Sequence, residues 1–95
     1  MLPFQVTAAT LTNVASSASN VTVVAANPSR RALIIVNDST AILYLKFGAT
    51  ASATSYSVKL IAGETYNSPI NHIYTGIIDG IWAAANGAAR VTELT

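Results

Sequence analysis

Turn-forming residues recur along most of this chain at intervals of about 8 to 12 residues and separate short runs of β-branched and apolar residues. No segment combines a helical 3.6-residue period with helix caps. This pattern predicts an all-β fold: an antiparallel, jelly-roll-like β-sandwich of seven or eight short strands. The expected strands cover residues 21–26, 31–37, 41–47, 56–61, 65–67, 74–85 and 88–94, with residues 72–74 as a further candidate.

The pair Asn86-Gly87 is the strongest local turn signal in the chain. It lies between two apolar segments, and Asn-Gly tolerates the positive φ angles that a type I′ turn requires. The sequence therefore predicts a hairpin in which residues 74–85 pair with residues 88–94.

Side-chain alternation assigns the strand faces. Leu43, Leu45 and Phe47 fall on one face of their run, and Lys46 falls on the other, so the first face is expected to point into the core. Residues 31–37 are almost continuously apolar, which indicates a central strand covered on both faces. The expected core consists of Leu33, Ile35, Leu43, Leu45, Phe47, Val58 and Leu60.

Residues 1–20 differ from the rest because a short apolar tip is followed by a run of Ala, Ser, Thr and Asn. We expect an extended N-terminal arm over residues 1–20 and a β-sandwich domain over residues 21–95. The arm either docks on a neighbouring molecule or frays. An edge strand near residues 10–14 is an open alternative. The apolar tip consists of Leu2, Pro3, Phe4 and Val6.

Charge is scarce in this sequence. Only 9% of its residues are charged and the net charge is +1, whereas about a quarter of an average soluble domain is charged. Such a surface is inexpensive to desolvate and repels other copies weakly, so we interpret it as a surface that other proteins cover. The low charge predicts no nucleic-acid partner. The sequence also predicts no membrane segment and no signal peptide.

Reactive residues are few and dispersed. The chain has no cysteine and a single histidine, His72. No serine lies in a nucleophile-elbow pattern, and the acids lack the spacing of a calcium site. We therefore expect no enzyme, no cofactor and no metal. The acids are Asp38 and Asp79, expected to hydrogen-bond within turns, Glu64, expected in the turn after Gly63, and Glu93, expected to pair with Arg90 or Lys46.

Arg30 and Arg31 form the one local concentration of charge. They could contact nucleic acid or an acidic partner. The interpretation we favour is structural, with Arg31 paired to an acid at the end of the sandwich and Arg30 solvated.

Two sequence blocks carry a resemblance to a known family. One covers residues 27–39, Asn-Pro-Ser-Arg-Arg-Ala-Leu-Ile-Ile-Val-Asn-Asp-Ser, and continues through residues 43–48. The other includes residues 74–76, 80–82, 85–87 and 91–93. Together they resemble a small β-rich module in virion proteins of tailed bacteriophages. There it occurs as a capsid decoration (cement) protein or within head-fibre and tail-associated proteins.

The resemblance implies a structural protein of the virion, made in the host cytoplasm, with no catalytic residues to transfer. It favours a homotrimeric decoration protein that clamps adjacent major-capsid subunits. The alternatives are a tail or head-fibre adaptor and, less favoured, a carbohydrate-binding module using Tyr44, Tyr56 and Tyr66. The expected protein-interface residues are Leu2, Pro3, Phe4, Val6, Arg30 and Tyr66.

Overall fold

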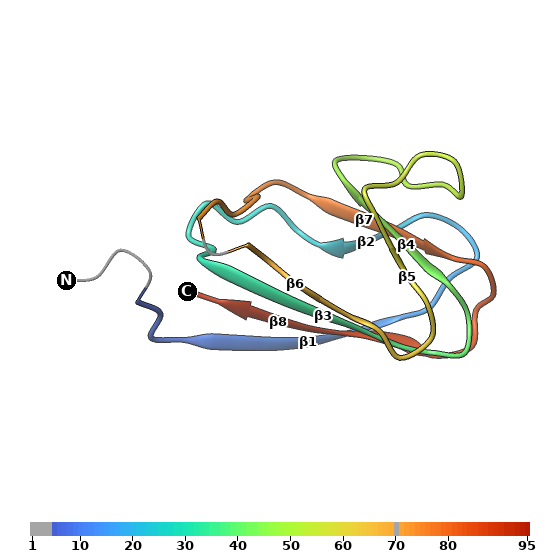
Figure 1. Cartoon of the computed structure of the whole chain (residues 1–95), viewed down its shortest axis with the longest axis horizontal. Coiled ribbons are helices and arrows are strands. Elements are labelled where there is room, and N and C mark those ends of the chain that lie inside the picture. The colour runs from blue at the N-terminus through green and yellow to red at the C-terminus, as the bar shows by residue number, and fades with distance from the viewer. Residues whose placement is uncertain (1–4, 70) are drawn as a thin grey trace.

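The computed structural model describes residues 5–69 and 71–95 and consists of two antiparallel four-stranded sheets packed face to face (Figure 1). One sheet has the strand order β1-β8-β3-β6 and the other β2-β7-β4-β5. This confirms the antiparallel β-sandwich. The strands are β1 (Ala9–Ala15), β2 (Val21–Val24), β3 (Ala32–Asp38), β4 (Leu43–Phe47), β5 (Val58–Leu60), β6 (Thr65–Asn67), β7 (Ile78–Trp82) and β8 (Ala88–Leu94).

The pairing follows the jelly-roll scheme. β1 pairs with β8, β2 with β7, β3 with β6 and β4 with β5, all antiparallel. The first half of the chain is thus matched against the second half in reverse order, and this double ribbon is rolled into two sheets. Residues 72–74 form no strand. The start of β1 and the C-terminus of the chain lie at the same end of the sandwich (Figure 1).

β1 is an edge strand of the first sheet, so the alternative of an edge strand near residues 10–14 is correct. It pairs with β8 from Ala9↔Leu94 to Ala15↔Ala88 without a register shift. Residues 9–15 of the expected arm are therefore part of the sandwich.

The hairpin predicted at Asn86-Gly87 does not form. β7 and β8 belong to different sheets, and the connection between them crosses the end of the sandwich. Among the described residues, positive φ occurs at Gly48, Thr50 and Gly63 only, so this connection is not a type I′ turn. Gly87 is needed for a different reason: a Cβ there would overlap the backbone oxygen of Asp38.

The predicted strand faces are confirmed. Leu43 and Leu45 are completely buried, whereas Lys46, on the opposite face, is half-buried. Leu33, Ile35 and Leu60 are also in the core, and Phe47 and Val58 are half-buried and pack against it. The prediction that β3 is covered on both faces is wrong, because its outward residues Ala32, Ile34 and Val36 are only half-buried. No second layer of the described chain lies over them.

Candidate interaction site

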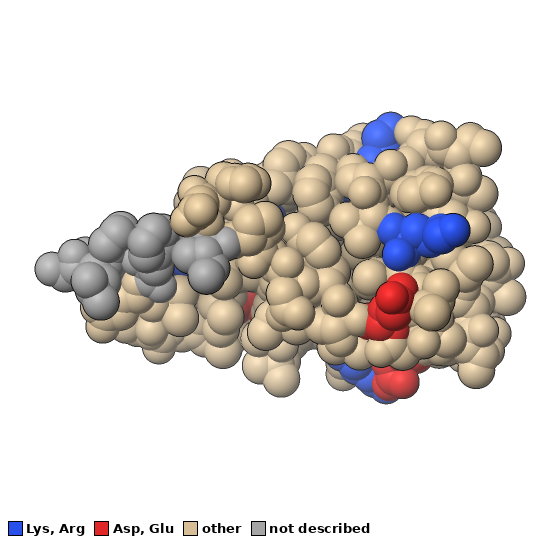
Figure 2. All heavy atoms as spheres, in the orientation of Figure 1, with Lys and Arg blue, Asp and Glu red and all other residues tan. Residues whose placement is uncertain are grey.

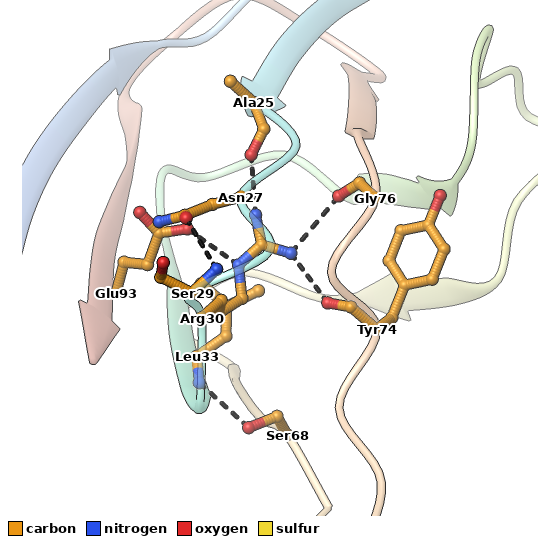
Figure 3. Close-up of polar contacts among 9 residues, drawn as sticks. All are labelled: Ala25, Asn27, Ser29, Arg30, Leu33, Ser68, Tyr74, Gly76 and Glu93. Carbon is orange, nitrogen blue, oxygen red and sulfur yellow. Dashed lines mark hydrogen bonds and ion pairs between the residues drawn. The ribbon is translucent and has the colours of Figure 1, made fainter. Parts of the chain in front are cut away.

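Arg30 is buried in the interior of the sandwich (Figure 3). The next residue, Arg31, donates its backbone N–H to Leu94 O at 2.8 Å, so Arg30 lies at the end of the sandwich that holds the C-terminus. Its Nε donates to Glu93 Oε2 at 2.7 Å, and its side chain is fully buried. The two terminal nitrogens donate to backbone oxygens of Ala25 (2.7 Å), Tyr74 (2.7 Å) and Gly76 (3.2 Å). The guanidinium therefore ties together the segment after β2, strand β8 and the segment before β7.

This arrangement corrects two expectations from the sequence. Arg30 is the buried arginine and is not solvated. Glu93 pairs with Arg30 and not with Arg90 or Lys46. A charge held in this way is part of the fold, so Arg30 presents no surface to a partner.

The remaining acids also have structural roles. Asp38 pairs with Arg90 at 2.9 Å, with both side chains about half exposed. Asp79 is a buried residue of β7 that accepts hydrogen bonds from the side chains of Asn20 and Thr22. These contacts replace the turn bonds predicted for both aspartates. Glu64 lies in its predicted turn, where its Oε1 accepts from the backbone N–H of Ile61 at 2.7 Å.

The outer face of the first sheet carries apolar residues on β1, β3 and β8. The register places Leu11, Thr92, Ile34 and Asn67 side by side in one row across all four strands. Leu11 is 75% exposed, the highest value among the large hydrophobic residues described. We name this face the outer sheet face; its apolar residues are Ala9, Leu11, Ala15, Ala32, Ile34, Val36, Ala88 and Leu94.

Charge on the outer sheet face is confined to one end. Arg90 and Asp38 point outward there and neutralise each other. The space-filling view shows the same tendency for the side of the molecule it presents, where most visible charged atoms gather away from the chain termini (Figure 2). The strand residues on the rest of this face carry no charge, so a partner that covers them desolvates no charged side chain there.

The outer face of the second sheet carries a pair of tyrosines. Tyr44 and Tyr56 have ring centroids 5.0 Å apart and an interplanar angle of 53°. Tyr66, expected to accompany them, lies on the inner face of the other sheet, where its ring contacts Phe47. Burial raises the pKa of the Tyr66 hydroxyl. Tyr66 therefore does not join the two other tyrosines on one platform.

The other expected interface residues are at the N-terminal end. Leu2, Pro3 and Phe4 lie outside the described residues, and Val6 is half-buried just before β1. Sequence reasoning missed Leu11, Ile34 and Leu94 as surface residues. The sequence feature that could have indicated Ile34 was the continuous apolar run of β3. In the structure this run supplies one buried face and one apolar outer face.

Reactive and metal-binding side chains are few among the described residues and do not cluster. His72 is exposed in the segment between β6 and β7. Residues 5–69 and 71–95 bring together no group of three or more His, Cys, Asp or Glu that could hold a metal ion. They contain no helix of the length and hydrophobicity needed to cross a membrane.

A cleft of about 380 Å³ opens between the sheets, lined by Thr12, Val23, Val24, Ala25, Ala26, Asn27, Val91 and Glu93.

No protein family, curated protein or solved structure matches this chain.

Proposed function

We propose that this chain is a non-enzymatic structural protein of a tailed-bacteriophage virion, a decoration (cement) protein on the capsid surface. The outer sheet face is the observation that carries this proposal. It exposes Leu11 and leaves Ile34 and Val36 half-covered, with charge only at one end. Such a face is suited to being buried against another protein.

The proposed mechanism is passive. The protein binds the assembled shell by laying its outer sheet face across neighbouring major-capsid subunits. Binding to the assembled state alone stabilises that state by mass action. Nothing in this mechanism requires a reactive group, in keeping with the structural roles of the four acids.

Two experiments test the proposal. Electron microscopy of intact particles of the encoding phage is expected to show many copies over the shell. A few copies at one vertex or on the tail would support the tail or head-fibre adaptor instead. In a binding assay with undecorated shells, Ile34→Arg is expected to bind at least tenfold more weakly, because it places a charge in the middle of the outer sheet face. The control is Ile81→Arg on the other sheet, which is expected to bind like the wild type.

The N-terminal segment is part of the same proposal. Deleting residues 1–8 is expected to leave the β-sheet circular-dichroism signal intact, because β1 begins at Ala9. It is expected to weaken shell binding about tenfold or more if Phe4 is buried against the shell, since burying a Phe stabilises by about 1.5–3 kcal/mol. Equal binding by the truncated protein would remove the segment from the mechanism.

A second candidate function, binding of a carbohydrate, is favoured by Tyr44 and Tyr56. Their rings are in contact on an outer face, and Tyr56 is 42% exposed. Quenching of tyrosine fluorescence by oligosaccharides, lost in Tyr56→Ala, would support it.

A further inference from the structure

We propose that β1 is a self-association edge, where two copies of this chain pair their β1 strands antiparallel about a two-fold axis at Thr12. The inference concerns the free protein and does not depend on the proposed function. It predicts a dimer, in contrast to the homotrimer expected from the resemblance.

The first step is that β1 has a free hydrogen-bonding edge. β1 ends the first sheet, and among the described residues β8 is the only strand that pairs with it. Thr95 donates its N–H to Ala8 O, and Ser16 donates its N–H to Gly87 O, so the even-numbered residues of this segment bond to β8. In an antiparallel ladder these residues alternate with residues whose backbone groups point away. The residues whose backbone N–H and C=O groups point away from β8 are therefore Ala9, Leu11, Asn13 and Ala15, here called the outward set.

The second step is that β1 lacks the devices that keep edge strands from pairing. These are short length, charged side chains, proline and bulges. β1 is seven residues long, uncharged, free of proline and paired to β8 without a register shift.

The three other sheet edges described each carry at least one of those devices. β2 has four residues and a register irregularity between Thr22 and Val24. β5 has three residues with Lys59 in the middle. β6 also has three residues and is followed closely by Pro69. The contrast singles out β1 as the edge that remains open to pairing.

The third step identifies the occupant as a second copy. A two-fold axis brings each side chain near its own counterpart, so like charges on such an edge repel. Residues 1–29 contain no Lys, Arg, Asp or Glu, which removes that penalty along β1 and β2. Full overlap of two β1 strands centres the axis on Thr12 and uses the whole outward set of both copies. Pairing with the three-residue β6 of a second copy would form a much shorter ladder.

The side chains also fit this register. On the outer side, Leu11 lies opposite Asn13 of the second copy, and Ala9 lies opposite Ala15. On the inner side, Thr10 lies opposite Val14, and Thr12 meets Thr12. β-branched residues pack well in such cross-strand pairs. The joined sheet contains four strands from each copy and makes the two outer sheet faces continuous.

Disulfide crosslinking tests the register directly, since the natural chain has no cysteine. Two Thr12 residues on the axis form a non-hydrogen-bonded pair with Cα atoms about 4.5 Å apart, within the range a disulfide spans. Thr12→Cys is therefore expected to form a covalent dimer under mild oxidation. The matched control is Thr10→Cys on the same strand and face, where the two Cα atoms lie about 13 Å apart and no crosslink is expected. No crosslink in either variant, or equal crosslinking in both, would overturn the proposal.

Light scattering on the uncrosslinked protein tests the dimer itself. The wild type is expected to have twice the chain mass of 9.8 kDa, and Leu11→Lys is expected to raise the dissociation constant at least tenfold. Ile61→Lys is the matched control, because Ile61 is another exposed apolar residue, 52% accessible, away from β1. A monomeric or trimeric wild type, or equal dissociation in both variants, would refute the self-association edge. Shell binding is measured separately, so either proposal can fail alone.

Discussion

Trp82 donates its indole N–H to Asn37 Oδ1 at 3.2 Å in the interior of the sandwich, and this bond joins β7 of one sheet to β3 of the other. Asn37 is fully buried. Its Nδ2 donates to the backbone oxygens of Ala41 (2.8 Å), Leu60 (3.0 Å) and Ile61 (3.1 Å). One amide side chain therefore fixes two loops and the opposite sheet at the end of the molecule away from Arg30.

We expect Asn37→Leu to lower the free energy of unfolding by at least about 3 kcal/mol. The substitution leaves several buried polar groups without partners, and each such group costs about 1–3 kcal/mol. Urea denaturation provides the measurement, with Asn67→Leu on the exposed face of β6 as the control, expected to stay within about 0.5 kcal/mol of the wild type. An unchanged midpoint for Asn37→Leu would contradict this role.

Arg30→Met is expected to destabilise the protein by about 3–5 kcal/mol, because it leaves Glu93 and three backbone oxygens without their buried partner. The matched substitution Arg90→Met breaks a pair that is about half exposed, and we expect it to cost at most about 1 kcal/mol. Chemical denaturation of both variants checks the contrast. Equal effects would mean that burial of the Arg30 pair is unimportant.

Gly87→Ala is expected to destabilise the protein because its Cβ would overlap the backbone oxygen of Asp38 and the Ser39 side chain. Backbone atoms cannot move aside as a flexible side chain would, so we expect a loss of about 1–3 kcal/mol. Asn86→Ala is the control: it removes one exposed hydrogen bond to Thr40, worth about 1 kcal/mol or less. A thermal melt of Gly87→Ala that coincides with that of the wild type would argue against close contact here.

Stability is expected to fall in alkaline solution as Tyr66 ionises. Burial raises the pKa of Tyr66 above its usual 10.0, so the unfolded chain releases this proton more readily than the folded chain. The stability that this difference in the Tyr66 pKa contributes to the folded protein is fully present below about pH 10, and it is lost as the pH rises through the folded-state pKa. Melting temperatures from pH 8 to 11 should fall less steeply for Tyr66→Phe than for the wild type.

Several features of the fold could be predicted from the sequence because they depend on neighbouring residues. Alternation along residues 43–47 placed Leu45 inside and Lys46 outside, as observed. Turn residues and short β-branched runs predicted the all-β sandwich and most of its strands. The faces follow from the two-residue period of a strand, and the strand positions follow from turn residues and β-branched runs; both are local properties of the chain.

The candidate interaction site could be predicted only in part. The scarcity of charge indicated a surface that other proteins cover, but not which face. The apolar run of β3 was interpreted as cover on both sides, because a sequence cannot distinguish a second protein layer from an apolar surface. The register with β1 and β8 places Leu11 and Ile34 on one exposed face.

The sequence by itself determined the fold class, the inward face of residues 43–47 and the low charge of the surface, since each follows from composition or from residues a few positions apart. Tertiary structure alone decided which strands share a sheet and which residues meet. Asn86-Gly87 has a strong hairpin signal, yet the strands on either side pair with partners in opposite sheets. Arg30 and Glu93 are 63 residues apart and meet only because the jelly roll brings the start of β3 beside the end of β8. Burial of the whole core selects such pairings, and no local turn preference outweighs it.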